Sequence, residues 1–253
     1  MISLFWGLFL AILLQCILFI PAYYFRTDKL TDFAYGLTFI FIGLFYLFFN
    51  ETSFLKFVMT FIIITWALRL SIYLIIRIKK IGRDTRFDEI RKNPIKFGKF
   101  WLFQGILAWI IMLPAVLFLQ SEFIDFNFLV ILGLFIWLVG MLIESIADYQ
   151  KFKFKNHDKN KGKWIDSGLW KYSRHPNYFG EMLIWVGVYI FAFSSISNWL
   201  IALISPISII LILRYVSGIP PLEKRYAERY KNNKDYWKYV KTTNLLIPWL
   251  KKY

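Results

Sequence analysis

The chain has 253 residues, of which 58% are hydrophobic and 21% aromatic, a composition that excludes an ordinary soluble domain of this length. A net charge of +15 could suggest a nucleic-acid partner, but the basic residues gather between long apolar runs, as they do in polytopic membrane proteins. The single cysteine, Cys16, excludes an intrachain disulfide.

Seven apolar runs follow one another, and several approach the roughly 20 residues that a membrane-spanning helix needs. The predicted spans are Leu4–Phe25, Phe33–Phe49, Phe54–Ile76, Trp101–Leu119, Phe126–Ala147, Tyr178–Phe193 and Trp199–Val216. The first run lacks a small-residue cleavage site, so we expect it to be a retained span and not a signal peptide. The sequence therefore predicts an all-α, multi-pass integral membrane protein with residues 1–253 in one domain.

The distribution of positive charge predicts the orientation. Of the 31 Lys and Arg residues, 29 fall in segments that seven spans would leave on one side of the membrane. The richest connections are Arg77–Lys99 and Asp148–Pro176, and a further polar tail follows Gly218. By the positive-inside rule these segments are cytoplasmic, which places the N-terminus outside and the C-terminus in the cytoplasm.

A polar motif lies where the sixth span begins. Arg174 and His175 precede Pro176, which suits the first turn of a helix, and Asn177 and Glu181 follow one turn apart. A helix N-terminus beside an arginine is a ready site for a phosphate group. The alternative is a charged membrane anchor, but an anchor needs no inward-facing amide and acid. The motif predicts a polar ligand at the cytoplasmic face.

The end of the fifth span carries two acids on one helix face. Glu144 and Asp148 are four residues apart and need polar partners or ligand hydroxyls and amides. They could instead be a helix-end pair neutralised by Lys151 and Lys155. Lys155 could also reach a phosphate.

The early spans contain further polar groups. Arg69 shares a face of the third span with Trp66 and Tyr73, and an arginine in hydrocarbon is expected to face a cavity or an acid. Asp32 and Tyr35 form a similar face in the second span. There the alternative is a helix start capped by Thr31 or Asp32. In the fourth span, Gln104 is either a ligand contact or a hydrogen bond between helices.

Several common sites are missing from the sequence. It contains no Gly-x-Gly-x-x-Gly run and no P-loop, and two histidines are too few for a histidine-rich metal centre. We therefore expect no metal. An enzyme built on this chain would rely on a dissociable cofactor that carries the reactivity.

The segment Arg174–Glu181, Arg-His-Pro-Asn-Tyr-Phe-Gly-Glu, resembles the steroid 5-alpha-reductase superfamily and is most similar to its bacterial branch of uncharacterised membrane proteins. The resemblance extends over nearly the whole chain. The same block is similar to sterol C14- and C7-reductases, and a shorter version occurs in isoprenylcysteine and phospholipid methyltransferases. The motif is thus more specific for the superfamily than for the reaction.

The resemblance implies a seven-helix fold that binds NADPH between the last three spans and the cytoplasmic loops. Asn177 and Glu181 would hold the nicotinamide and its ribose, whereas Asp148 and Glu144 would bind the adenosine side or order the site. Glu144 departs from the steroid reductases, which tend to have Asn there. The other residues expected at the phosphates or elsewhere on the cofactor are Lys155, Lys163, Arg174, Arg83, His175, Tyr178, Arg69 and Gln104.

The resemblance also implies hydride transfer from NADPH to a conjugated enone, with a hydrogen-bond donor at the carbonyl oxygen. Trp66 stands where the steroid enzymes have a catalytic Tyr, and an indole N–H is a poor acid. Tyr35 or Asp32 is therefore expected to supply the acid. This departure leaves a steroid, another lipophilic enone, or an unsaturated fatty or isoprenoid chain open as substrate.

The sequence thus predicts an NADPH-dependent reductase of a lipophilic carbon–carbon double bond, with membrane lipids around it. Residues 1–120 would form the substrate half and residues 121–253 the cofactor-binding half. A methyltransferase using S-adenosylmethionine and a non-enzymatic lipid- or sterol-binding protein are the alternatives. The family resemblance and the absence of a retrieval signal favour a bacterial inner membrane.

Overall fold

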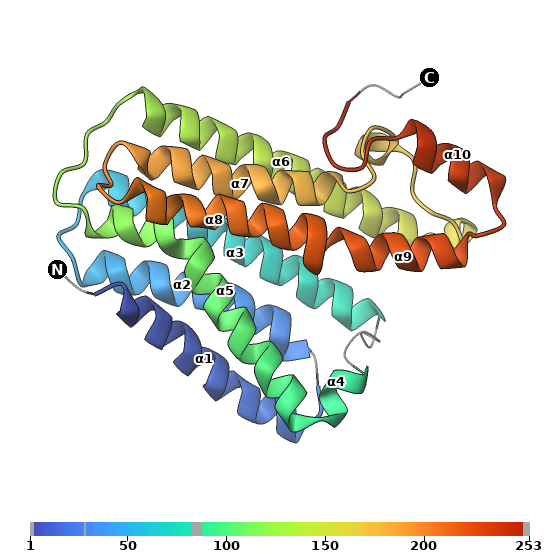
Figure 1. The fold of residues 1–253 in the computed structure, drawn as a ribbon, viewed down its shortest axis with the longest axis horizontal. Coiled ribbons are helices and arrows are strands. Elements are labelled where there is room, and N and C mark those ends of the chain that lie inside the picture. The colour runs from blue at the N-terminus through green and yellow to red at the C-terminus, as the bar shows by residue number, and fades with distance from the viewer. Residues whose placement is uncertain (1–2, 28, 82–87, 250–253) are drawn as a thin grey trace. The chain divides into compact units, whose positions relative to one another are not determined.

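The computed structural model describes residues 3–27, 29–81 and 88–249, and these residues form helices joined by turns and irregular segments, with no β-strand among them (Figure 1). The α-helices are α1 Phe5–Tyr24, α2 Lys29–Phe48, α3 Phe54–Ile81, α4 Asp88–Lys92, α5 Pro94–Gln120, α6 Phe128–Lys155, α7 Pro176–Phe193, α8 Trp199–Leu211, α9 Ile219–Arg229 and α10 Lys234–Thr242. Two short 3₁₀ turns, Asp158–Asn160 and Gly168–Lys171, lie between α6 and α7, and a π-helical turn, Ile212–Val216, joins α8 to α9.

Within the described residues, six helical stretches are long and apolar enough to cross a membrane: α1, α2, most of α3, α5, α6 and the continuous stretch Trp199–Arg229. They coincide with six of the seven predicted spans, which confirms an all-helical, multi-pass membrane protein. α7 coincides with the other predicted span but is not among the six. It has 18 residues, and Asn177 and Glu181 lower the hydropathy of its first turns.

The charged connection predicted over Arg77–Lys99 is more helical than its composition indicates. α3 continues to Ile81, the short helix α4 follows, and α5 begins at Pro94. The Asn93 side chain caps α5 by accepting hydrogen bonds from two backbone N–H groups at 3.0 Å, and Pro94 needs no such partner. Charged side chains project into solvent from a helix as readily as from a loop. The high charge of this segment therefore did not reveal that α3 and α5 continue into it. Arg83 and its neighbours lie outside the described residues.

The chain divides into two compact units, and the first comprises residues 1–127 and 192–205. In it α1, α2, α3 and α5 pack against one another. A buried polar network crosses three of these helices: the Gln15 amide donates to Thr38 at 3.0 Å, and the Gln104 amide donates to the Thr31 carbonyl at 2.9 Å. Buried amides in an apolar bundle need such partners, and the network fixes how the helices face each other.

The second unit comprises residues 128–191 and 206–253. Its centre is the contact between α6 and α7, where glycines of both helices allow the two backbones to touch. A Cβ atom on Gly140 would lie 2.7 Å from the Gly180 carbonyl oxygen, and a Cβ atom on Gly180 would lie 2.6 Å from the Glu144 nitrogen. A Cβ on Gly187 would likewise lie 2.6 Å from the Trp137 nitrogen. No larger residue fits at these positions without separating the helices.

We predict that Gly140→Ala lowers the free energy of unfolding by about 1–3 kcal/mol, since the added methyl group must push backbone atoms apart. Gly43→Ala in α2 is the matched control, because its Cβ would meet side-chain atoms only at 3.7 and 3.9 Å. Thermal unfolding of the detergent-solubilised variants measures both. Equal melting temperatures for Gly140→Ala and Gly43→Ala would refute the close contact between α6 and α7.

Candidate cofactor site

The polar motif predicted at the sixth span lies at the start of α7. Pro176 is the first residue of the helix, so Asn177 and Glu181 occupy its first two turns, as the sequence predicts. The Asn177 amide nitrogen donates a hydrogen bond to the Asp148 carboxylate of α6 at 3.3 Å. The Asn177 carbonyl oxygen is buried and has no hydrogen-bond partner among the described residues.

The two acids of α6 belong to the same site. Glu144 and Asp148 are 2% and 5% exposed, so both carboxyl groups lie inside the protein. Asp148 reaches Asn177 because Gly180, one turn later on α7, lets the backbones of the two helices touch at Glu144. A buried carboxylate and a buried amide oxygen suit a ligand that presents hydroxyl or amide donors.

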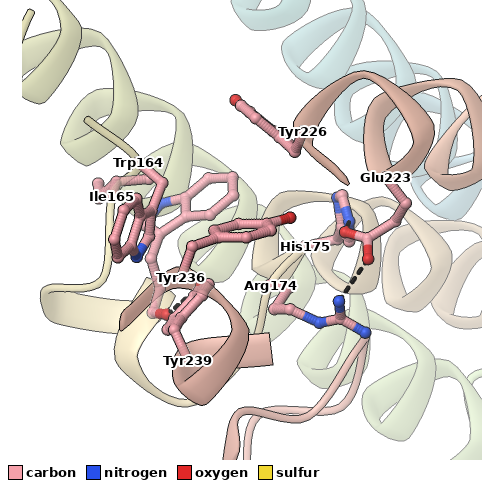
Figure 2. A pocket seen from close by; sticks show the side chains of 9 residues that line it. Trp164, Ile165, Arg174, His175, Glu223, Tyr226, Tyr236 and Tyr239 are labelled. Atoms are coloured by element: carbon pink, nitrogen blue, oxygen red, sulfur yellow. Dashed lines mark hydrogen bonds and ion pairs between the residues drawn. The ribbon is translucent and has the colours of Figure 1, made fainter. Parts of the chain in front are cut away.

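Arg174 and His175 converge on a single acid, Glu223, in the first turns of α9 (Figure 2). Arg174 Nη1 donates to Glu223 Oε2, and His175 Nε2 lies 2.8 Å from Glu223 Oε1. The His175 side chain is 2% exposed and its ring stacks in parallel on Tyr178, with ring centroids 5.7 Å apart. Charge-assisted hydrogen bonds of this kind orient both side chains firmly.

The C-terminal segment holds the backbone of the same motif. The Arg174 N–H donates to the Asn244 carbonyl at 2.9 Å, and the Ser173 hydroxyl donates to the Leu246 carbonyl at 2.6 Å. The Ser173 oxygen also accepts the His175 N–H at 3.1 Å. Segments about 70 residues apart in sequence thus fix Arg174 and His175 from the backbone side, while Glu223 fixes their side chains.

A small, partly open pocket lies beside this cluster. Its lining residues are Trp164, Ile165, Trp170, Arg174, His175, Glu223, Tyr226, Tyr236 and Tyr239 (Figure 2). The walls are therefore mostly aromatic, with the polar groups of the motif along one side. Aromatic faces stack on flat rings and arginine attracts anions, so these walls have the chemistry that recognises a flat ring attached to an anionic group.

The pocket also offers hydrogen-bond donors. Trp164 Nε1 and Arg174 Nε are buried and have no hydrogen-bond partner within the described part of the chain. Burial raises the pKa of Tyr236 to about 12, so its hydroxyl is protonated at neutral pH and can donate. These groups favour a ligand with several acceptor atoms.

Lysines surround the pocket. Lys155 Nζ lies 5.7 Å from the centroid of the Tyr226 ring, and Lys151 Nζ lies 4.6 Å from that of Trp170. Lys163 is exposed, next to Trp164 in sequence. An ammonium group beside an aromatic wall suits an anion next to a stacked ring, and the phosphate contact of Lys155 stays a prediction.

The residues predicted in the early spans lie in the first unit. Tyr35 and Trp66 both pack against Phe39, with ring centroids 4.9 Å apart in each pair, so α2 and α3 bring the two together. Asp32 pairs with Arg77 at 3.5 Å. α2 begins at Lys29, where the Thr27 hydroxyl accepts the Lys29 N–H, so the alternative of a cap at Thr31 or Asp32 is wrong.

The remaining predictions have mixed outcomes. Gln104 takes part in a hydrogen bond between helices, which is the alternative that the sequence left open. Arg69 lies half-buried in α3, and Arg83 lies outside the described residues. In the part of the chain that the structure describes, no three His, Cys, Asp or Glu side chains gather to hold a metal ion. The units divide at residue 127, and residues 192–205 belong with the first. The division into a substrate half and a cofactor-binding half stays a prediction.

Sequence reasoning missed most of the pocket. Glu223, Trp164, Tyr236 and Tyr239 were not predicted as site residues, although an acid two positions after Pro221 in a basic helix is a local signal. The two tyrosines are three residues apart and share a face of α10, but that spacing is equally typical of a packed core.

The buried histidine gives a testable pH dependence. Burial lowers the pKa of His175 more than the Glu223 carboxylate raises it. In the unfolded chain a histidine titrates near pH 6.5, so below that value the unfolded state binds a proton that the folded state does not.

We therefore predict that the stability of the protein falls as the pH drops from about 7.5 to about 5.5, and that His175→Gln flattens this slope. Melting temperatures of the detergent-solubilised protein across this range measure it. His157→Gln, at an exposed position, should keep the slope of the wild type. An unchanged slope in His175→Gln would show that another group controls the transition.

Comparison with known proteins places the chain in a family. Residues 18–243 match the family described as "Protein of unknown function (DUF1295)". An uncharacterized protein of Schizosaccharomyces pombe is 28% identical over 200 residues, which cover 66% of this chain and 57% of the yeast protein. The bovine (Bos taurus) protein named 3-oxo-5-alpha-steroid 4-dehydrogenase 1 is 30% identical over 118 residues, which cover 47% of this chain and 41% of the bovine one.

The chain thus spans about half the length of these curated relatives, and no solved structure matches it. The family match, in contrast, extends from α1 into the C-terminal segment and includes the whole motif at α7. The chain belongs to the DUF1295 family, within the steroid 5-alpha-reductase-like superfamily.

Proposed function

We propose that the protein is a membrane reductase that uses NADPH to reduce a carbon–carbon double bond in a lipophilic substrate. The observation that carries the proposal is the second unit's arrangement of Arg174 and His175, which line an aromatic pocket directly before Asn177 and Glu181 on α7. The name of the bovine relative, which describes a dehydrogenase acting at position 4 of a 3-oxo steroid, supports this chemistry.

The residues of the second unit fit a nicotinamide dinucleotide. The unpartnered carbonyl oxygen of Asn177, together with Glu181, suits the amide and hydroxyl donors of the nicotinamide riboside. Asp148, which accepts a hydrogen bond from Asn177, would order this site with Glu144. The aromatic pocket suits the adenine ring, and Arg174, Lys155 and Lys163 suit the phosphates. The positive surroundings favour NADPH over NADH, since the additional phosphate is anionic.

When bound, NADPH supplies the hydride. The chain's own residues then have two tasks, which are to orient the cofactor and to donate a hydrogen bond to the substrate carbonyl oxygen as charge develops there. Tyr35 and Trp66, which share the Phe39 contact, are the proposed donors. Asp32 is paired with Arg77, and an ionised carboxylate only accepts hydrogen bonds. Tyr35 is therefore a better proton donor than Asp32.

The proposal includes the topology. We propose that α7 is a seventh span and that the start of α7 faces the cytoplasm, where NADPH is available. Because the proposed substrate is lipophilic, it would enter the protein from the bilayer and would need no water-filled entrance. The substrate class is a lipophilic enone, steroidal or otherwise.

We predict that Asn177→Ala and Glu181→Ala each raise the Kd for NADPH by about 10- to 100-fold, which corresponds to the loss of one or two buried polar contacts. Isothermal titration of the purified protein in detergent measures this, with Asn232→Ala, at an exposed loop position, as the control. Wild-type affinity in both site variants would contradict the cofactor assignment.

We further predict that Tyr35→Phe slows turnover of a reducible enone by about 100-fold while the Kd for NADPH stays within about twofold of the wild type. Trp66→Phe should slow turnover without weakening NADPH binding. NADPH consumption by the protein in liposomes measures turnover, and Tyr24→Phe, an exposed hydroxyl on α1, is the control. If turnover is unchanged in both site variants, the proton donor lies elsewhere.

A further inference from the structure

Glu223 has an unusual position in the pocket. Among the described residues that line the pocket it is the only carboxylate, and each of its two oxygens binds a different basic side chain, Arg174 and His175 (Figure 2). The three residues come from two segments about 50 positions apart, since Glu223 belongs to α9 and the two bases precede α7. One acid therefore determines the orientation of two adjacent motif residues.

The contact with Glu223 also determines which ring nitrogen of His175 carries the proton. A carboxylate only accepts hydrogen bonds, so the Nε2 atom at 2.8 Å must be the protonated one. In the neutral ring, Nδ1 is then left with a free lone pair. Nδ1 is buried and has no hydrogen-bond partner among the residues that the structure describes.

We propose that Glu223 is a positioning residue that fixes the Nε2–H tautomer of His175, so that Nδ1 accepts a hydrogen bond from an N–H or O–H group of the bound dinucleotide. The inference rests on the proposed NADPH-dependent function and assigns to His175 a specific contact within it. A buried acceptor without a partner costs free energy in the free protein, and a ligand donor removes that cost. The cofactor groups with this chemistry are the carboxamide, the ribose hydroxyls and the adenine amino group.

The charges around the pair support a neutral ring. Arg174 and Lys151 act on His175 as nearby positive charges, and Arg214 acts on Glu223 in addition. The neighbouring Tyr236 hydroxyl is protonated at neutral pH. Glu223 is thus an anion among cations, and adding a proton to His175 would place a further positive charge beside Arg174.

A purely structural role for Glu223 makes a different prediction. If the carboxylate served only to fasten α9 to the start of α7, its loss would lower stability without affecting either the tautomer or the affinity at a temperature where the variant is folded. The tautomer therefore has to be measured directly.

The chain allows this measurement because it has only two histidines. In a His157→Gln background, ¹⁵N-histidine NMR reports on His175 alone. The protein would be compared with Glu223→Ala and Glu223→Gln, and with Glu228→Gln as a control that removes an exposed acid from the same helix. Spectra would be recorded with and without NADPH, and the Kd for NADPH measured for each variant.

We expect an unprotonated Nδ1 in the parent protein and a shift of its resonance when NADPH binds. Glu223→Ala should give mixed tautomers and a Kd about 10- to 100-fold higher. Glu223→Gln should keep the tautomer, because the Gln carbonyl still accepts from Nε2–H, and should lose less affinity. Glu228→Gln should match the parent.

A protonated Nδ1 in the parent protein, or an unchanged tautomer and affinity in Glu223→Ala, would overturn the inference. If the parent binds no NADPH, the proposed function fails and so does the ligand contact. Mixed tautomers in Glu223→Ala would then still support the positioning role of Glu223.

Discussion

The close approach of α6 and α7 is the constraint on which the candidate site depends. Gly140 and Gly180 let the helix backbones touch, so that a side chain as short as Asn177 can reach Asp148. Without that contact the acids of α6 would be buried charges in an apolar bundle, at considerable cost. The glycine in the Arg-His-Pro-Asn-Tyr-Phe-Gly-Glu motif, Gly180, is therefore a packing residue that brings the polar side chains of α7 within reach of the acids of α6.

A second constraint acts just before α7. Ser173, Arg174 and His175 are held by the C-terminal segment through their backbone or hydroxyl groups and by Glu223 through their side chains. Groups fixed in this way need little reorganisation when a ligand binds, which improves affinity. The aromatic pocket, the surrounding lysines and the buried acceptors together favour an anionic ligand that carries flat rings and polar donors, and a dinucleotide has all three features.

The sequence was sufficient for the parts of the fold that depend on local pattern. Apolar runs predict the spans because a bilayer requires continuous apolar helices, and Pro176 marks the start of α7 to within two residues of the prediction. Asp148 and Asn177, both expected at the cofactor from the family resemblance, lie within hydrogen-bond distance of each other, and their contacts with a cofactor stay a prediction. The charge pattern was a poorer guide, because the C-terminal end of α3 and the N-terminal end of α5 are helical where the composition indicated a loop.

What could not be predicted depends on long-range contacts. No local pattern joins Glu223 to Arg174, which lies 49 residues away, or brings Trp164 to Tyr236. From the sequence, Gln104 could be either a ligand contact or a structural group. The structure decides between them, because the Gln104 amide donates a hydrogen bond to the Thr31 carbonyl of a neighbouring helix. The catalytic roles proposed for Tyr35 and Trp66 depend on a substrate, so neither the sequence pattern nor the packing determines them.

Hydrogen–deuterium exchange with and without NADPH is the sharpest test of a nicotinamide cofactor at the start of α7, because it locates the ligand as well as detecting it. We expect NADPH to protect the segments around residues 162–181 and 219–246 from exchange, and S-adenosylmethionine to give no comparable protection. Absence of protection in these segments at saturating NADPH, or protection there by S-adenosylmethionine alone, would contradict a nicotinamide cofactor in this site.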